Sequence, residues 1–435
     1  MRLNTKTVTP ALRTHEGAIA ARASVHQQLA RSTLACLLWE KQFYEDGQEI
    51  AARIDSLVQK ADPEFVAQLA VKARSSYNLR HMPLYLCALL AKYHKGNLVG
   101  RTLTECIQRA DELAEFLAIY WRNGKCPLSK QVKIGLGVAF HRFSEYQLAK
   151  YNRDKDIKLR DVMRLVHPRP QNKKQEQLWK RLLDDKLETP DTWEVALSSG
   201  ANKKATWTRL LQEQKLGYLA LLRNLRNMSQ ANVDERLIRD ALLKHEGRHR
   251  VLPFRYLAAA RAAPHLEDTI DEAMQQALES GPRLPGHTVV LIDHSGSMQY
   301  PLSAKSDLTR FDAAAALAVL IRGIGERVDV YAFSNDVTQV PPRKGMALVD
   351  ALHRCMGWGG TWLGRAVAQM PACDRLIVIT DEQSSDYVEG PRATRGYMVN
   401  VASYQNGVGY NAGWTKVSGF SENIVRWIQE TENEE

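Results

Sequence analysis

The chain has 435 residues, of which 44% are hydrophobic and 25% are charged. This length allows about two to four domains of ordinary size, and the composition excludes a disordered or fibrous chain. The longest apolar run, Ala313–Ile321, is too short to cross a bilayer, and Arg2 and Lys6 are not followed by the apolar core of a secretory signal. We therefore expect a cytoplasmic protein with no membrane partner.

The formal net charge of +10 is distributed unevenly along the chain. Residues 1–284 carry 46 Lys and Arg against 32 Asp and Glu, whereas residues 285–435 carry 13 against 17. A basic part joined to a mildly acidic part predicts a polyanion-binding module beside a domain of another kind. We accordingly predict two domains, residues 1–284 and residues 285–435.

Residues 1–284 have the pattern of successive helices. Apolar residues recur at three-to-four spacing in residues 32–39, 64–71 and 84–91, and Asp62 before Pro63 is typical of a helix start. No tract of alternating β-branched residues interrupts the series. Many short helices with short connections predict an α-solenoid of stacked helical hairpins, irregular because no strict sequence period is present.

The stretch 218–228 shows the helical pattern most clearly. Leu221, Leu225 and Met228 share one face of the predicted helix. Arg223 and Arg226 lie on another face. We expect these two arginines either to face RNA or to pair with acidic neighbours between helices.

The pattern changes after residue 284. Short apolar runs at residues 288–292, 327–333, 375–379 and 397–401 predict strands, and helical stretches at 311–322, 347–355 and 363–370 separate the first three. Such alternation predicts a doubly wound α/β domain with a parallel sheet covered on both faces. Sheets of this class bind ligands outside the carboxyl ends of their strands.

Oxygen-bearing side chains follow the predicted strands at that edge. The first strand ends in Asp-His-Ser-Gly-Ser, a later one ends in Thr-Asp, and a Gly-rich segment between them ends in Thr. The candidate metal ligands are Asp293, Ser295, Ser297, Thr361 and Asp381. Two carboxylates and three hydroxyls suit Mg²⁺ or another hard divalent cation. The alternative is a metal-free turn in which Asp293 and Ser297 cap the following segment.

This spacing resembles the metal-ion-dependent adhesion site of von Willebrand factor A domains. The resemblance implies that Ser295, Ser297 and Thr361 coordinate the ion directly, and that Asp293 and Asp381 act through water. The segment lacks the GxxxxGK[ST] pattern of a phosphate-binding loop and the GxSxG pattern of a serine hydrolase.

The chain as a whole resembles the Ro ribonucleoprotein family, whose helical part is the TROVE module. Residues 218–228 are similar to the family's ALLRNLxNM helix, residues 161–170 to its DLLRLxHxKP segment, and residues 73–80 to its bacterial members. We expect a bacterial or phage-type member. The resemblance implies a ring of HEAT-like helical hairpins closed by the α/β domain, with no catalytic activity.

The resemblance also implies RNA partners. Family members bind small structured Y-like RNAs on the outer surface and single-stranded 3′ ends of misfolded or decaying RNAs in a basic central hole, and bacterial relatives are tethered to polynucleotide phosphorylase. Lys150 and Arg153 are similar to the family's KYxxR stretch, and His167 to its RNA-binding histidine. The alternative is that Lys150 and Arg153 are only a solvent-exposed helix face and that His167 makes its hydrogen bonds within the protein.

Two other functions remain as alternatives. In the first, the protein is an interaction scaffold whose metal site captures a partner's carboxylate, without an RNA role. In the second it is a metal-dependent phosphatase or nuclease, which the sequence disfavours because the site offers no histidine base and one evident metal position. We therefore predict a non-catalytic RNA-binding protein of RNA quality control.

Overall fold

The computed structural model describes most of the chain. The described residues are 13–19, 24–34, 46–152, 155–189, 192–198, 200, 202–251, 253–279, 283–302, 306–355, 357–402, 407–408, 413–419, 424–425, 428 and 432. Their contacts divide them into two compact units. Unit 1 comprises the described residues up to 46 and from 246 onward, and unit 2 comprises those between 47 and 245.

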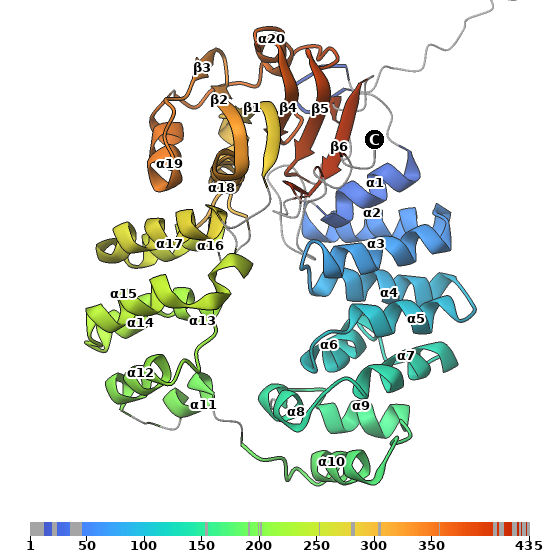
Figure 1. Ribbon diagram of the computed structural model, residues 1–435. Helices are drawn as coiled ribbons and strands as arrows, with labels where there is room; N and C mark the ends of the chain where they lie inside the picture. Colours follow the sequence, from blue (N-terminus) through green and yellow to red (C-terminus); the bar gives the residue numbers. More distant parts are fainter. Residues whose placement is uncertain are drawn as a thin grey trace, which may run out of the picture. The chain divides into compact units, whose positions relative to one another are not determined.

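Unit 2 is helical throughout its described residues. Its helices are α2 (Gly47–Lys60), α3 (Pro63–Ser75), α4 (His81–Tyr93), α5 (Leu98–Cys106), α6 (Asp111–Tyr120), α7 (Lys130–Phe140), α8 (Glu145–Tyr151), α9 (Leu159–Val166), α10 (Lys173–Leu183), α11 (Trp193–Ser198), α12 (Lys203–Gln212), α13 (Tyr218–Arg223), α14 (Leu225–Gln230) and α15 (Glu235–Lys244). From α2 to α7, helices pack against those one or two places along the chain (Figure 1), which is the packing of a helical solenoid.

The starts of these helices follow from local sequence. Asp62 caps α3, since its carboxylate accepts a hydrogen bond from the Phe65 amide at 3.0 Å and Pro63 occupies the first helical position. The predicted helix 218–228 is instead two short helices, α13 and α14, that meet at the buried Asn224. The Asn224 amide group donates to the Ala220 carbonyl at 2.8 Å, so this side chain occupies an acceptor of the preceding turn.

Unit 1 joins helices from both ends of the described chain to a sheet. Its elements are α1 (Val25–Leu34), η1 (Glu246–Arg250), α16 (Pro253–Ala262), η2 (Pro264–Leu266), α17 (Glu267–Glu279), β1 (Leu284–Asp293), η3 (Gly296–Gln299), α18 (Arg310–Ile324), β2 (Gly325–Phe333), β3 (Val337–Gln339), α19 (Gly345–Arg354), α20 (Leu363–Ala368), β4 (Cys373–Thr380), β5 (Ala393–Asn400) and β6 (Trp414–Ser418). No helix within the described ranges has both the length and the apolarity of a membrane span.

The sheet has the order β3-β2-β1-β4-β5-β6, and all neighbours are parallel except β2 and β3. The four predicted strands are therefore confirmed as β1, β2, β4 and β5. The short antiparallel edge strand β3 and the opposite edge strand β6 were not predicted. Strand β3 has only three residues, and in β6 the polar Thr415 and Lys416 separate the apolar Trp414 and Val417, so neither strand contains a continuous apolar run.

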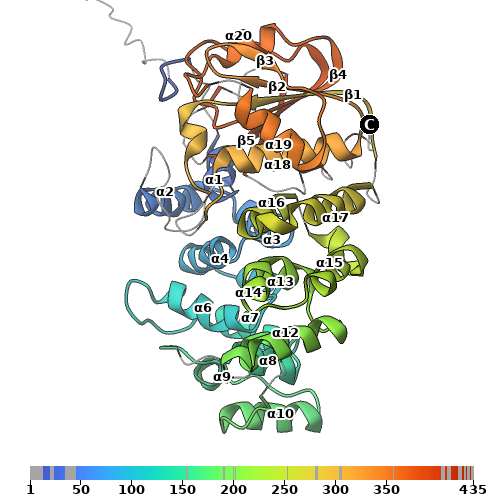
Figure 2. The ribbon, with the colours of Figure 1, turned by 90° about the vertical axis from the view of Figure 1, so that its left-hand side faces the viewer.

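Helices cover both faces of this sheet. On one face Leu363, Ala366 and Val367 of α20 pack in a core with Leu291 of β1 and Val378 of β4. On the other face α18 packs against β1 and β2, and α19 packs against α18. Figure 2 shows α20 and the α18–α19 pair on opposite sides of the strands. This is the predicted doubly wound arrangement, and it explains why the central strands are apolar on both faces.

The change from helices to strands lies between Glu279 and Leu284, near the domain boundary expected at residues 284 and 285. The contacts divide the chain elsewhere, at residues 245 and 246, so that α16 and α17 belong to the compact unit that contains the sheet. The predicted boundary thus separates two kinds of secondary structure rather than two contact units, and as a domain boundary it stays a prediction.

A buried ion pair ties α1 to the sheet within unit 1. Arg31 donates to the Glu382 carboxylate at 2.8 Å, and the exposed fractions of the two side chains are 0% and 2%. The Thr14 hydroxyl donates to the Ser384 carbonyl at 2.7 Å, and the His15 amide donates to the Gln383 side chain at 2.8 Å. Residues from the beginning of the chain therefore hold the segment that directly follows β4.

We predict that Arg31→Met lowers the free energy of unfolding by about 3–5 kcal/mol, because it leaves the Glu382 carboxylate buried without this partner. The measurement is equilibrium urea unfolding. Arg101→Met is the matched control, since the Arg101–Glu64 pair at 3.0 Å is more than half exposed and should contribute about 0–1 kcal/mol. Equal losses in the two variants would contradict this assignment.

Candidate functional site

The two predicted acidic ligands lie together at the centre of the sheet edge. Strands β1 and β4 are neighbours, and the chain leaves β1 towards β2 on one side and later continues from β4 towards β5 on the other. Asp293 ends β1 and Asp381 directly follows β4, and both are fully buried. Their position is the topological switch point, where open α/β sheets form their ligand crevices.

Two hydrogen bonds hold the Asp293 carboxylate in one orientation. Its Oδ1 accepts from the Ser295 amide at 2.9 Å, and its Oδ2 accepts from the Thr380 hydroxyl at 2.5 Å. The hydroxyls of Ser295 and Ser297 lie 3.2 Å apart, and both residues are buried. The turn after β1 therefore places one carboxylate and two hydroxyls in a single cluster.

The Gly-rich segment adds the fifth predicted ligand. Ser295 and Gly359 form a parallel bridge, and the Gly296 amide donates to the Gly359 carbonyl at 3.2 Å. Two residues later, the Thr361 carbonyl accepts from the Ser385 amide at 2.7 Å. These contacts place Thr361, which is 3% exposed, between the turn after β1 and the segment after β4. The segments that carry all five predicted ligands therefore meet at this edge.

The electrostatics of the cluster are unfavourable for two free carboxylates. Burial, and secondly the negative charge of Asp381, raise the pKa of Asp293 to about 7. The Asp381 Oδ2 has no hydrogen-bond partner among the described residues. Within the described ranges, the buried Arg310 of α18 forms an ion pair with that oxygen, with its Nη1 3.8 Å away. One guanidinium therefore compensates part of the negative charge.

These observations fit a hard divalent cation. A buried carboxylate with an unsatisfied oxygen, a second carboxylate with a raised pKa, and adjacent hydroxyls are a donor set that a cation would complete. Thr380 and Arg310 were not predicted as parts of the site. Thr380 precedes a predicted ligand, which is a usable indication, whereas Arg310 is separated from every motif and is placed only by the packing of α18.

Aromatic side chains surround the same edge. His294 is fully buried, and its ring stacks on Trp358 with centroids 4.0 Å apart and meets Phe311 edge-on at 4.6 Å. Burial lowers the pKa of His294. Trp358 and Trp362 are 40% and 44% exposed, on either side of the buried Thr361. The site therefore combines buried polar groups with exposed indole rings.

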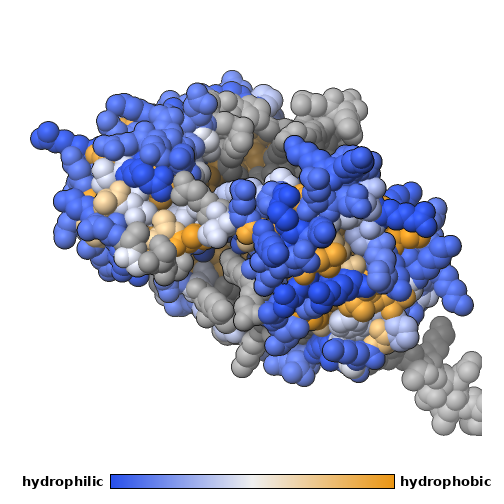
Figure 3. Space-filling view, turned by 90° about the horizontal axis from the view of Figure 1, so that it is seen from below, coloured by the Kyte–Doolittle hydropathy of each residue, from blue (hydrophilic) through white to orange (hydrophobic). Residues whose placement is uncertain are grey.

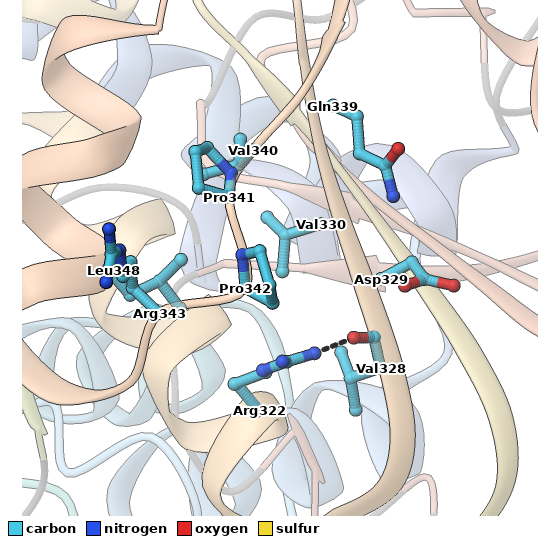
Figure 4. A pocket seen from close by; sticks show the side chains of 10 residues that line it. All are labelled: Arg322, Val328, Asp329, Val330, Gln339, Val340, Pro341, Pro342, Arg343 and Leu348. Carbon is cyan, nitrogen blue, oxygen red and sulfur yellow. Dashed lines mark hydrogen bonds between the residues drawn. The ribbon is translucent and has the colours of Figure 1, made fainter.

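A separate hollow of about 260 Å³ lies beside the edge strand, between α18 and the β2–β3 hairpin (Figure 4). Proline and aliphatic side chains form much of its lining. Its carboxylate, Asp329, is bound by His287 at 2.7 Å, and Arg322 donates to the Val328 carbonyl. Since its carboxylate already has a partner, we assign no ligand to it.

The predicted RNA-binding residues do not form one cluster. Lys150 lies on α8, with its ammonium 5.9 Å from the rings of Tyr146 and Tyr151. His167 ends α9 and lines a groove whose lining residues do not include Lys150. The other predicted residues are Arg153, which lies outside the described residues, and Arg223 and Arg226, whose side chains are exposed on α13 and α14. Among the described residues Arg223 has no ion-pair partner, so the pairing with an acidic neighbour that the sequence allowed is not seen there.

Comparisons with known proteins agree with the architecture. Residues 20–185 and 180–288 match the TROVE domain family. The crystal structure of the Ro (Rsr) protein of Deinococcus radiodurans superimposes with a TM-score of 0.60 and 18% identity, covering 92% of this chain and 97% of that chain. At this identity the likeness shows the fold alone, and it confirms the predicted order of a many-helix region followed by a mostly parallel sheet.

Sequence similarity extends to two much larger proteins. Telomerase protein component 1 of Mus musculus is 32% identical over 145 residues, and that of Rattus norvegicus is 29% identical over 148 residues. Each match covers 31% of this chain but only 5% of the length of the telomerase component. These relatives therefore share one segment with the chain and not its whole organisation.

We predict that the metal-free protein loses stability as the pH rises through the folded pKa of Asp293. The folded state keeps this proton up to about pH 7, whereas the unfolded chain releases it near pH 4. The free energy of unfolding therefore falls as the pH rises between these values. The slope is at most about 1.4 kcal/mol per pH unit. Urea unfolding in a chelator at pH 5, 6, 7 and 8 measures it. Asp293→Asn should flatten this dependence, and an unchanged slope in that variant would contradict the assignment.

Proposed function

This chain belongs to the TROVE domain family, and on that premise we propose that it is a non-catalytic RNA-binding protein of RNA quality control. The observation that carries the proposal is the family match over residues 20–288, which is almost the same part of the chain that holds the excess of 46 basic over 32 acidic residues. A basic surface supplies the phosphate contacts on which RNA affinity mainly depends.

The proposed division of labour follows the family resemblance. The helical region binds a small structured, Y-like RNA on its outer surface through Lys150, Arg153 and His167, and takes single-stranded 3′ ends of misfolded RNAs in a basic central hole of a ring. Arg223 and Arg226 are proposed contacts for RNA. The RNA then tethers the protein to an exoribonuclease such as polynucleotide phosphorylase. Exposed arginines, whose planar forks suit phosphate, support this role.

We further propose that the edge of the sheet binds Mg²⁺ or another divalent cation. Ser295, Ser297 and Thr361 would hold the ion directly, and Asp293 and Asp381 through water. When bound, the ion would neutralise the buried carboxylates and offer an open coordination position. The support is the unsatisfied Asp381 oxygen beside a carboxyl group whose pKa burial has raised.

A second candidate function uses the same edge without RNA. The protein would then be a scaffold whose metal captures the carboxylate of a partner protein. The exposed rings of Trp358 and Trp362 on both sides of Thr361 favour this candidate, since exposed indoles are common anchors of protein interfaces.

The metal proposal predicts that Asp293→Ala abolishes binding of one divalent ion. Calorimetric titration with Mn²⁺ or Mg²⁺ should show one site in the wild-type protein and none in the variant, while both remain folded by circular dichroism. Asp350→Ala removes the same charge from α19, where the carboxylate is 62% exposed, and should leave the site intact. Unchanged metal binding in Asp293→Ala would refute the proposal.

The RNA proposal predicts a strong dependence on salt. If about six phosphates are contacted, the log–log slope for single-stranded RNA is near −4, and affinity falls roughly a few hundred-fold between 50 and 200 mM salt. Fluorescence anisotropy with a labelled single-stranded RNA measures this slope. A hairpin with a single-stranded 3′ tail should bind more tightly than a blunt hairpin. A slope near zero would favour the protein-scaffold candidate.

A further inference from the structure

A buried arginine stands beside the cluster of candidate metal ligands. Most charged side chains of a folded protein lie at the surface, as the hydrophilic groups that dominate the face in Figure 3 do. The Arg310 side chain is instead 2% exposed, and its Nη1 lies 3.8 Å from the Oδ2 of Asp381. Burial of a guanidinium is costly unless an opposite charge compensates it, so this position indicates an electrostatic role.

Contacts outside the ligand cluster fix where this side chain lies. Arg310 is the first residue of α18, and Thr309 and Asp312 form a capping box at that helix start, with hydrogen bonds of 2.8 and 3.1 Å. The Arg310 amide donates to the Tyr300 carbonyl at 2.9 Å, and the guanidinium lies 5.4 Å from the centre of the Tyr300 ring. The start of α18 and Tyr300 therefore hold the arginine at the edge of the sheet.

Two other buried carboxylates near this edge already have cations of their own. Asp312 accepts from Arg261 at 2.8 Å. Glu382, which directly follows Asp381, is held by the ion pair with α1. The Oδ2 of Asp381, by contrast, accepts no hydrogen bond from a described residue. Asp381 is therefore the carboxylate on which the charge of Arg310 acts at close range.

The separation from Asp381 allows attraction without a hydrogen bond. A gap of 3.8 Å between Nη1 and Oδ2 exceeds the hydrogen-bond range of about 2.7–3.2 Å. Because both side chains are buried, solvent and salt screen the attraction only weakly. The guanidinium thus lowers the cost of burying the carboxylate and leaves its oxygen available to a further ligand.

We propose that Arg310 is a resident counter-ion of the metal site, which stabilises the buried carboxylates of the metal-free protein and limits the affinity of the site for a divalent cation. The inference rests on the proposed metal function and deepens it, since it names the residue that sets how tightly the ion is held. Arg310 is not a ligand in this proposal, and it acts on the ion through its charge.

The balance of charge explains the two opposite effects. Two ionised carboxylates and one guanidinium have a net charge of −1, and a divalent cation changes it to +1. Without the guanidinium, the same ion would change the net charge from −2 to zero. The arginine therefore relieves the repulsion between Asp293 and Asp381 when no ion is bound, and it repels the ion when one is bound.

A role in packing alone predicts a different pattern. An arginine that only fills the space beside Tyr300 would contribute to stability with and without metal, and its replacement would leave the metal affinity unchanged or lower it. A counter-ion instead combines lower stability of the metal-free variant with tighter binding of the metal. These two changes of opposite direction distinguish the two roles.

Calorimetric titration with Mn²⁺ at pH 8 compares the wild-type protein with Arg310→Gln, which removes the charge, and Arg310→Lys, which keeps it. Arg310→Gln should bind Mn²⁺ at least about tenfold more tightly, because a buried like charge a few ångströms away is weakly screened. Arg310→Lys should stay within about threefold of the wild-type affinity, because the ammonium carries the same charge. Arg354→Gln removes this charge from α19, where the side chain is 79% exposed, and should bind Mn²⁺ as the wild type does.

Thermal unfolding supplies the second measurement. In a chelator Arg310→Gln should unfold at a lower temperature than the wild type, and saturating Mn²⁺ should raise its midpoint by more than it raises the wild-type midpoint. If Arg310→Gln is unfolded without metal, Mn²⁺ should restore its folded circular dichroism spectrum, and absence of this recovery would contradict the inference. Arg310→Gln/Asp293→Ala, which also lacks a candidate ligand, should gain nothing from Mn²⁺.

The outcomes separate failure of this inference from failure of the metal proposal. If neither the wild type nor any variant binds Mn²⁺, the metal proposal itself is wrong and the inference falls with it. If the wild type binds Mn²⁺ and Arg310→Gln binds it equally or more weakly, the metal site stands and the counter-ion role is overturned. Equal tightening in Arg310→Lys and Arg310→Gln would assign the effect to size rather than charge, and would overturn that role as well.

Discussion

The burial of two carboxylates at the ends of neighbouring parallel strands is the constraint on which the candidate site depends. Pairing of β1 with β4 places Asp293 and Asp381 at one edge, where neither is solvated. Apolar helices cover both faces of the sheet, and polar groups converge at this edge. The Thr380 hydroxyl, the Ser295 amide and Arg310 each compensate part of the resulting charge, and the remaining imbalance is what makes the edge suitable for a cation.

The same edge is connected to the beginning of the chain. Glu382 follows Asp381 directly and is held by Arg31 of α1, and the next two residues are hydrogen-bonded to Thr14 and His15. A buried ion pair contributes little net stability compared with an apolar pair, but breaking it is costly. Its consequence here is positional, because it restrains the backbone beside a candidate metal ligand.

Helices of unit 2 bury one face against their neighbours and leave another face at the surface. One face of α7 is buried, and the outward face carries the aliphatic Ile134 and Val138. Basic side chains line the same groove as these two residues. Exposed Ile and Val are unfavourable in water, and a left-handed His167 adds strain at the end of α9. Both features are easier to explain as parts of a binding surface than as devices for folding.

Much of the fold follows from local patterns in the sequence. Continuous apolar runs predict β1, β2, β4 and β5, and their alternation with helices predicts the doubly wound sheet. Both are visible because a strand buried on two faces is apolar throughout, whereas a helix repeats its apolar residues every three to four positions. The five candidate metal ligands are also visible, since each stands where a predicted strand or glycine segment ends. By contrast, β3 and β6 are edge strands whose pairing depends on a neighbour, and the break at Asn224 depends on one side-chain hydrogen bond.

What only the tertiary structure decides are the relations between residues far apart in the chain. Arg310 reaches Asp381 through the packing of α18, and Arg31 reaches Glu382 across 351 residues. Gly137 of α7 lets Val166 and Pro168 approach closely. In the sequence, Ile134 and Val138 read as part of one apolar helix, and nothing local distinguishes the buried face from the exposed one. The sequence shows the spacing of apolar residues, but which face of a helix is buried depends on the neighbouring elements that pack against it.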